Sequence, residues 1–580
     1  MEVLRILSDP ELDLTVDLET TGYNPYTDYI ICISIAAGSS EGEGHRPTIG
    51  YTIPWELFEG EDNKAFIVLK SLLETCIVIY FNGAFDCQFL KEFGINAFIG
   101  SDPMLKHYTL DERTGVQGLK HVAKVQCNAP DWEAPLKPFL PSRDTSFDKV
   151  PRDILFEYAA LDSCYTGTLD LVISDLMDAN DWRVYNNILL PAANMLLDVT
   201  GVGIKIDLTK LDELRTEYIA KIQYLEEELV MLAEDPNFNP RSTKQAKWLI
   251  YDKVGIKGNG STARGVLEAY PNVPEAALLI EFRSTQKILG TYLEGILDDI
   301  VDGRIHPNLR LNGTVTGRLS ASKPNMLGMP KEKGGIKKLF VADEGFLLLE
   351  LDGKGMELWH LAALSKDPAM MADMGGGRDF HGEARNRLFS RGTGKENYNH
   401  QEVLDAKMIV FGPIYGRGAP SLAAQLKCSV STAQEWIDAI WDKYPVARQY
   451  LRDRVTEARE NGEVLSHYGR KRRWGLITAD NLKDVDHEAR NFAVSSPSSD
   501  TNLLCMLEIY KTFLRTDVLP LLPIHDAVLM SVNESKKDEL IPAICSLYCE
   551  TAQKLMQTDM PFKVEAEVGK SWGEMKEVKV

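Results

Sequence analysis

The sequence predicts a multidomain chain in which an α/β domain is followed by a larger α+β part. Three observations indicate this. The 580 residues are too many for a single core, which favours roughly three to five domains. Near the N-terminus, two apolar strands are followed by a helical stretch, as in α/β domains. In the C-terminal half, apolar runs with the length of buried strands are separated by long helical segments.

Composition indicates an ordinary globular protein, with 44% hydrophobic and 26% charged residues. There is no run of about 18 apolar residues and no basic N-terminal segment followed by a long apolar core, so we expect neither a membrane span nor a secretion signal. The nine cysteines are dispersed without metal-site spacing, which indicates reduced thiols. We therefore expect a cytoplasmic protein, in the host cytoplasm if the source is a virus.

The net charge of −21 argues against capture of nucleic acid by overall electrostatic attraction. Local basic stretches are still sufficient for phosphate contacts, and two of them lie in the second half, at residues 331–338 and 469–473. Each stretch has two interpretations, a phosphate-binding stripe or a solvated surface.

Acidic side chains in the N-terminal part follow a pattern that predicts a metal site. Asp17 and Glu19 lie on an alternating strand, so both point to one face. Asp86 follows a second apolar strand across a turn. Tyr158 and Asp162 are four residues apart in a helical stretch and share one helical face. If these residues converge, they form a two-metal hydrolytic site in which Tyr158 orients the attacking water.

The middle of the chain favours long helices. Apolar residues recur at helical spacing from Leu208 to Ala233, which predicts one amphipathic helix. Further on, Arg283 and Lys287 are one helical turn apart and could contact successive phosphates. The alternative for this pair is a salt-bridging helix surface.

A second pair of acids follows apolar strands in the C-terminal half. The run from Phe346 ends on Asp352 and gives way to a helix. Residues 519–532 form two apolar stretches with His525 and Asp526 between them, which predicts a hairpin. If the hairpin lies beside the first strand, the two acids meet, and carboxylates about 4 Å apart repel by about 4 kcal/mol at an effective dielectric constant near 20. Mg²⁺ would offset this repulsion, although Asp is also a common turn residue.

Between these acids, a helix carries Lys407, Phe411 and Tyr415 at intervals of four residues. One helical face therefore presents a cation and two aromatic rings. Such a face suits a nucleotide, because the ammonium meets the triphosphate and a ring stacks on the base or sugar. The alternative is an ordinary core stripe.

The N-terminal pattern resembles a known enzyme family. Asp17-Leu-Glu19-Thr-Thr-Gly, Asn82-Gly-Ala-Phe-Asp86 and Tyr158-x-x-x-Asp162 resemble the motifs of DEDD 3′→5′ exonucleases of the tyrosine subtype, and Asp102-Pro-Met-Leu and Gly118-Leu-Lys between them fit as well. The resemblance implies a ribonuclease H-like exonuclease domain over residues 1–180. It also implies that the four acids are catalytic metal ligands and that Tyr158 is a further catalytic residue.

The rest of the chain resembles the family A DNA polymerases. The likeness is close from Thr314-Val-Thr-Gly-Arg318 to Pro324-Asn325, and Asp352 and Asp526 fall at the family's catalytic, metal-binding positions. The resemblance implies a right-hand polymerase domain. Its expected parts are the thumb with connecting helices at 181–300, the palm at 301–370 and 481–580, and the fingers at 371–480.

The resemblance also implies contacts for particular residues. The expected nucleotide-binding residues are Glu357, which would exclude a ribose 2′-hydroxyl, the catalytic Lys407, and His381, Phe411 and Tyr415. The expected DNA-binding residues are Arg283, Lys287, Arg318, Asn325, Asn491 and His525. The implied cofactor is Mg²⁺, two ions per active site, with Mn²⁺ as a substitute. The implied partners are primer-template DNA, deoxynucleoside triphosphates and a replisome helicase, primase or processivity factor.

The expected function is therefore template-directed DNA synthesis with proofreading. The chain starts close to the exonuclease strand with no 5′-nuclease segment ahead of it, as in replicative, phage-type members of the family. Two other hypotheses remain open. One is a 3′→5′ exonuclease whose C-terminal half has become a DNA-binding platform, and the other is a scaffold without catalysis.

Several residues depart from the family pattern and keep the platform hypothesis open. These are Leu327, Gly353, Trp359, Val403, Ser495 and Ala527. Val403 occupies the place of a phosphate-binding arginine, and losing a charged contact to a buried partner commonly costs about 2–5 kcal/mol. Arg385 and Arg417, which lie near it in sequence, are the candidates to replace it.

Overall fold

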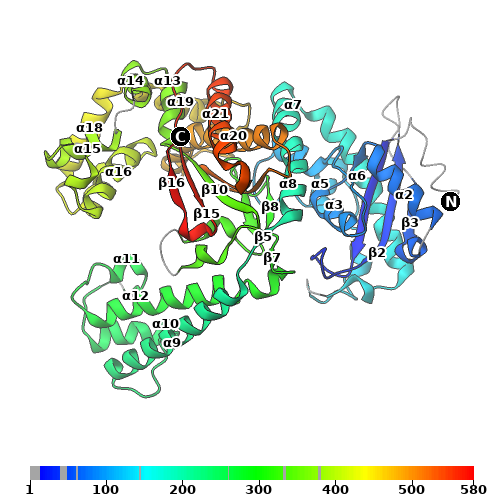
Figure 1. Ribbon diagram of the computed structural model, residues 1–580, viewed down its shortest axis with the longest axis horizontal. Helices are drawn as coiled ribbons and strands as arrows, with labels where there is room; N and C mark the ends of the chain where they lie inside the picture. Colours follow the sequence, from blue (N-terminus) through cyan, green and yellow to red (C-terminus); the bar gives the residue numbers. More distant parts are fainter. Residues whose placement is uncertain are drawn as a thin grey trace.

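The computed structural model describes residues 13–38, 49–60, 63–142, 145–258, 260–330, 335–376, 380–392 and 394–579. An N-terminal domain built on one sheet lies beside a larger part built on a second sheet, from which a helical unit projects (Figure 1). None of the helices in the described part of the chain combines the length and apolar character needed to cross a membrane.

The N-terminal sheet has the strand order β3-β2-β1-β4. Its central strand β1 pairs antiparallel with β2 and parallel with β4, and the long helix α6 packs on β1 and β2. The strand expected ahead of Asp86 is short, because only two residues pair with β1 before the chain turns into α3. The bounds are β1 Asp13–Thr20, β2 Ile30–Gly38, β3 Gly50–Pro54, β4 Val78–Ile79, α2 Lys64–Thr75, α3 Gly83–Glu92, α4 Pro103–Leu110, α5 Leu119–Cys127 and α6 Arg152–Leu176.

A helical unit with its own small core follows. Helix α9 spans Leu208–Ala233, the range that the apolar spacing predicts, and buries Leu225 and Leu229 against α12. Asp207 caps its start by accepting a hydrogen bond from the backbone N–H of Lys210 at 3.0 Å. The other helices of the unit are α10 Thr243–Lys247, α11 Arg264–Leu267 and α12 Pro274–Lys287, with π-helical segments at Trp248–Lys253 and Ile288–Glu294. Ahead of the unit, α7 Ala179–Val184, a π-helical segment at Tyr185–Leu189 and α8 Leu190–Val202 contribute to the main core.

The second sheet has the order β13-β14-β10-β15-β16, and helices α20 and α21 pack against it. The predicted hairpin is β13–β14, and β14 pairs antiparallel with β10, as the sequence predicts. The bounds are β10 Phe346–Gly353, α13 Met356–Ser365, α20 Leu482–Thr512, β13 Val518–Ile524, β14 Ala527–Asn533, α21 Lys537–Leu555, β15 Val564–Gly569 and β16 Lys576–Val578.

Small strands and a helical cluster complete the fold. The small strands are β5 Ile204–Lys205, β6 Ile300–Val301, β7 Arg304–Ile305, β8 Asn308–Arg310, β9 Ser320–Ser322, β11 Glu463–Leu465 and β12 Lys471–Arg473. The helical cluster, at the far end from the N-terminal domain (Figure 1), comprises α14 Pro368–Gly375, α15 Phe380–Phe389, α16 His400–Ile414, α17 Ala419–Leu426, α18 Val430–Lys443 and α19 Pro445–Asn461.

Candidate active sites

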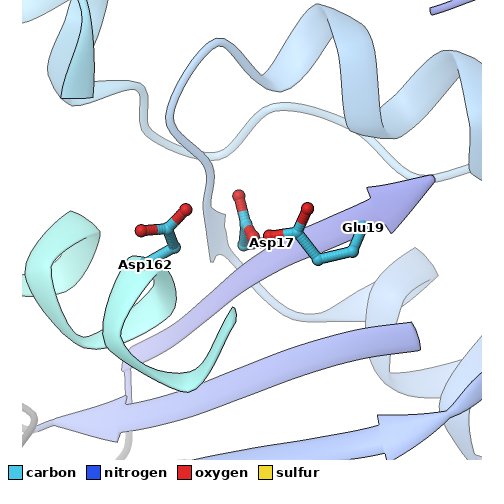
Figure 2. A group of neighbouring side chains, drawn as sticks. All are labelled: Asp17, Glu19 and Asp162. Carbon is cyan, nitrogen blue, oxygen red and sulfur yellow. The ribbon is translucent and has the colours of Figure 1, made fainter. Parts of the chain in front are cut away.

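Three of the four N-terminal acids converge. Asp17 and Glu19 project from the same face of β1, and Asp162 faces them from α6 (Figure 2). Each offers one carboxylate oxygen, and these oxygens lie within 4.8 Å of one another. This is the arrangement that the strand and helix spacings predict.

Burial and mutual repulsion make this cluster unfavourable without a cation. Burial, followed by the charge of Asp162, raises the pKa of Asp17 and of Glu19 well above their ordinary values. Asp17 Oδ2 is buried and accepts no hydrogen bond within the described part of the chain. A set of hard oxygen donors with an unsatisfied buried oxygen fits a divalent cation such as Mg²⁺ or Mn²⁺.

Asp86 lies next to this cluster, but its carboxylate is bound to the backbone of β1. It sits on the first turn of α3, and its Oδ1 accepts a hydrogen bond from the backbone N–H of Leu18 at 3.0 Å. Asp102 fixes the start of the same helix, because its carboxylate accepts hydrogen bonds from the N–H groups of Asn82 at 3.1 Å and Gly83 at 3.0 Å. Asp86 is therefore anchored against β1, outside the group of three acids.

Lys120 and Trp132 also contact the cluster, although the sequence pattern assigns neither of them a role. Lys120 forms an ion pair with Asp162 and lies 4.3 Å from the ring centroid of Tyr158. Trp132 Nε1 donates a hydrogen bond to Asp162 Oδ1 at 2.6 Å. Lys120 belongs to the Gly118-Leu-Lys motif, whereas no local pattern indicates Trp132.

The second pair of acids meets at the end of the C-terminal sheet. Asp352 on β10 is opposite Ala527 on β14, and the backbone N–H of Gly353 donates to the carbonyl of Asp526 at 3.0 Å. Both acids line one pocket of about 110 Å³, together with Glu350, Lys337 and other residues. Glu350 is not among the site residues expected from the sequence, although its position two residues before Asp352 puts it on the same strand face.

Two buried side chains hold the turn that carries Asp526. Asn502 on α20 donates from Nδ2 to the carbonyls of His525 at 2.9 Å and Ala527 at 3.2 Å. Its Oδ1 accepts a hydrogen bond from the hydroxyl of Tyr548 on α21 at 2.6 Å. His525 has a φ of 55°, so the turn needs this support.

Three other expected site residues form one network beside this pocket. Arg318 Nη2 pairs with Glu357 Oε1 at 2.8 Å. Ser495 Oγ lies 3.1 Å from the same oxygen and 2.6 Å from Asn491 Oδ1, so its single proton serves one of them at a time. Burial and the charge of Asp526 raise the pKa of Glu357. Asn325 stays separate and accepts from the N–H of Gly328 at 3.2 Å.

The nucleotide-binding helix expected from the sequence is α16. Lys407 is exposed, and the rings of Phe411 and Tyr415 stack with centroids 6.4 Å apart. The side chain of His381 lies outside the described residues. Of the two arginines considered as replacements at Val403, Arg385 is fully buried, and Arg417 donates to Ser421 Oγ at 3.0 Å beyond the end of the helix.

The projecting helical unit contains the remaining basic pair. Lys287 is exposed, whereas Arg283 is partly buried and donates to the hydroxyl of Thr262 at 3.1 Å. Burial lowers the pKa of Arg283. An open pocket of about 500 Å³ beside it is also lined by Arg241 and Lys247.

The basic stretch at 469–473 is neither a phosphate stripe nor a solvated face. Arg472 and Arg473 pair with Glu112 of the N-terminal domain at 3.2 and 2.9 Å, and Lys471 pairs with Asp181 at 2.9 Å. These partners lie about 300 residues away in sequence, so neither interpretation of the sequence included them. In the basic stretch at 331–338, residues 331–334 lie outside the described residues, and Lys337 pairs with Glu350 at 3.4 Å.

Gly353 and Trp359, two of the departures from the family pattern, pack against the same ring. A Cβ at Gly353 would lie 3.0 Å from Phe562 Cζ and 3.2 Å from Met356 Sδ. Phe562 therefore fills the space that a side chain at 353 would need. Trp359 is buried against Phe562 and donates from Nε1 to the carbonyl of Pro561 at 3.1 Å.

Comparison with known proteins identifies the class. A family model described as DNA polymerase family A matches residues 208–574, and a 3′-5′ exonuclease model matches residues 2–176. The first match covers more than half of the 580 residues, so the chain belongs to DNA polymerase family A. The expected fold class, an exonuclease domain followed by a polymerase domain, is confirmed.

Particular relatives come from bacteria and from a phage. The chain is 29% identical over 523 residues to DNA polymerase I of Chloroflexus aurantiacus, covering 85% of this chain and 54% of that protein. It is 28% identical over 503 residues to the DNA polymerase of Escherichia phage T5, covering 76% and 59%. The chain thus spans little more than half the length of these relatives.

A solved structure supports the fold. The POL domain of Pol1 from M. smegmatis, in complex with DNA primer-template and dNTP, superposes with a TM-score of 0.83 at 22% identity. The match covers 99% of this chain and 98% of that one.

Proposed function

We propose that this protein extends a primer 3′ end on a DNA template and removes nucleotides from that end by 3′→5′ hydrolysis. The observation that carries the proposal is the presence of two separate acid clusters in one family A chain. Asp352 and Asp526 line a pocket at the C-terminal sheet, and Asp17, Glu19 and Asp162 gather in the N-terminal domain. A replicative role of the phage type is part of the proposal, with the phage T5 relative as support.

Each of the two clusters is proposed to hold two Mg²⁺ ions, or two Mn²⁺ ions in their place. When bound, such ions stabilise the attacking and leaving oxygens of an in-line phosphoryl displacement. Asp17, Glu19, Asp86 and Asp162 would hold the ions of the hydrolytic site, with Tyr158 orienting the attacking water. Asp352 and Asp526 would hold those of the synthetic site.

The nucleotide would lie between α16 and the C-terminal sheet. Lys407 would pair with the triphosphate, Phe411 would pack on the sugar and Tyr415 would support the templating base. His381 is proposed as a further phosphate contact. Glu357 would exclude a ribose 2′-hydroxyl, and its contacts with Arg318 and Ser495 hold the carboxylate in place for this.

Primer-template DNA would contact basic and polar residues despite the net charge of −21. The proposed contacts are Arg283, Lys287, Arg318, Asn325, Asn491 and His525. The domain boundaries at 180, 300, 370 and 480, a cytoplasmic location, and a helicase, primase or processivity partner also remain predictions.

The proposal is tested by one incubation of a labelled, primed DNA template with the protein and Mg²⁺. With all four nucleotides the primer should lengthen, and without them it should shorten from its 3′ end. Chelation with EDTA should stop both reactions, because each depends on carboxylate-bound cations. A primer that never lengthens at any nucleotide concentration would leave the hydrolytic half alone.

That outcome corresponds to a second candidate, an exonuclease whose polymerase part only binds DNA. The observation that favours it is the surroundings of Val403. Arg385 is fully buried and Arg417 lies beyond the end of α16, so neither is positioned one turn before Lys407 as the phosphate-binding arginine would be. Nucleotide affinity is the property that separates the two candidates.

A further inference from the structure

The exonuclease domain and the polymerase part meet in a closely packed junction. We use this name for Tyr108 and Glu112 of the exonuclease domain, the loop 314–318, and the segment from Arg470 to Arg473. Glu112 is buried, accepts a hydrogen bond from the backbone N–H of Arg473 at 2.6 Å, and pairs with two arginines. Removing one partner of a buried ion pair is strongly destabilising, so this contact keeps the two parts in a fixed arrangement.

A line of hydrogen bonds runs from this junction into the proposed synthetic site. The hydroxyl of Tyr108 donates to the carbonyl of Thr314 at 2.6 Å. Thr314 Oγ1 donates to the carbonyl of Arg318 at 2.8 Å, and the Arg318 guanidinium pairs with Glu357. Two hydrogen bonds, the first made by Tyr108, thus connect the exonuclease domain with Arg318, a residue proposed to contact primer-template DNA.

The loop is also held from its other side. Arg470 Nε donates to both oxygens of the buried Asp500 at 2.9 Å, and its guanidinium lies 5.7 Å from the ring centroid of Tyr108. A Cβ at Gly317 would lie only 2.6 Å from Arg470 Nε, so the loop backbone packs directly on this arginine. The backbone of the loop is therefore held between Tyr108 and Arg470.

We propose that Tyr108 is a positioning residue for DNA synthesis, through which the exonuclease domain fixes the loop that presents Arg318. The proposal rests on the proposed function. Tyr108 lies on α4, whereas the proposed hydrolytic acids lie on β1, α3 and α6, so this role is separate from hydrolysis. Loss of the hydroxyl should weaken primer-template binding without altering the metal-binding acids.

The test is the Tyr108→Phe variant of the full chain, which keeps the buried ring and removes the hydroxyl that donates to Thr314. The KM for primer-template in nucleotide addition should rise about three- to tenfold, the range expected for one such bond, while kcat changes less than about twofold. The rate of degradation of single-stranded DNA should be unchanged. Tyr51→Phe is the control for a tyrosine hydroxyl removed elsewhere in the exonuclease domain, because β3 lies at the sheet edge away from the polymerase part (Figure 1).

Two further variants separate positioning from a general structural effect. In an Arg318→Lys background, Tyr108→Phe should add little, because both changes act on one line of contacts. Glu112→Gln, which weakens the junction from its charged side, should raise the same KM. An unchanged KM in Tyr108→Phe, an equal rise in Tyr51→Phe, or additive effects with Arg318→Lys would overturn the proposal. A wild-type protein that extends no primer would instead refute the proposed function.

Discussion

The replacement Asn502→Ala tests whether the turn carrying Asp526 is held by side chains from α20 and α21. Asn502 is 2% exposed and makes three hydrogen bonds, two to the carbonyls on either side of Asp526 and one from Tyr548. Alanine removes all three and leaves the Tyr548 hydroxyl buried without this acceptor. The turn then loses the contacts that support the left-handed backbone at His525.

The expected cost follows from these contacts. Each hydrogen bond contributes about 1 kcal/mol net, so the free energy of unfolding should fall by about 3 kcal/mol. The effect on synthesis should be larger than the stability loss suggests. A catalytic group displaced by about 1 Å commonly costs about 10²-fold in rate, so primer extension should slow by that order.

The assay combines urea unfolding with primer extension at saturating nucleotide. Asn194→Ala is the matched control, because Asn194 Nδ2 donates to the carbonyls of Ile99 at 3.0 Å and Leu190 at 3.2 Å, far in sequence from the turn. The control should lose stability of the same order and keep its extension rate. If Asn502→Ala loses stability but extends primers at the wild-type rate, Asn502 does not position Asp526.

Three further predictions concern packing, charge and DNA contact. Gly353→Phe should cost about 1–3 kcal/mol of stability through overlap with Phe562, part of it recovered in a Phe562→Ala double variant; an unchanged urea midpoint would contradict the packing. Because the folded state raises the pKa of Asp17, ionisation of this carboxyl opposes folding at pH values above its ordinary pKa. In EDTA, Asp17→Asn should therefore have a higher free energy of unfolding than wild type at neutral pH. This difference between variant and wild type should decrease as the pH falls toward about 4. Arg283→Ala should weaken primer-template binding and reduce the slope of log affinity against log salt by about 1, and an unchanged slope would exclude a phosphate contact.

Local patterns predict the elements that carry the sites. The apolar spacing predicts α9 to the residue, because an amphipathic helix leaves a regular 3.6-residue signal. The same holds for the hairpin and for the shared face of Asp17 and Glu19, which follow from the two-residue period of a strand. The strand before Asp86 is shorter than predicted because its pairing with β1 ends after two residues.

Long-range contacts could not be predicted in this way. Arg473 meets Glu112 across 361 residues of sequence, and no property of the basic stretch indicates that partner. Trp132 and Asn502 likewise acquire their roles only through folding, since each contacts an acid-bearing segment from a distant element. Glu350 is different, because its two-residue offset from Asp352 was a readable signal.

The most direct measurement of the two-site account compares Asp526→Asn with Asp17→Ala on one primed template in Mg²⁺. Asp526→Asn should lose extension and keep 3′→5′ degradation, because its change is confined to the pocket at the C-terminal sheet. Asp17→Ala should lose degradation and keep extension. A single substitution that abolishes both reactions in a folded protein would contradict the assignment of synthesis and hydrolysis to separate carboxylate clusters.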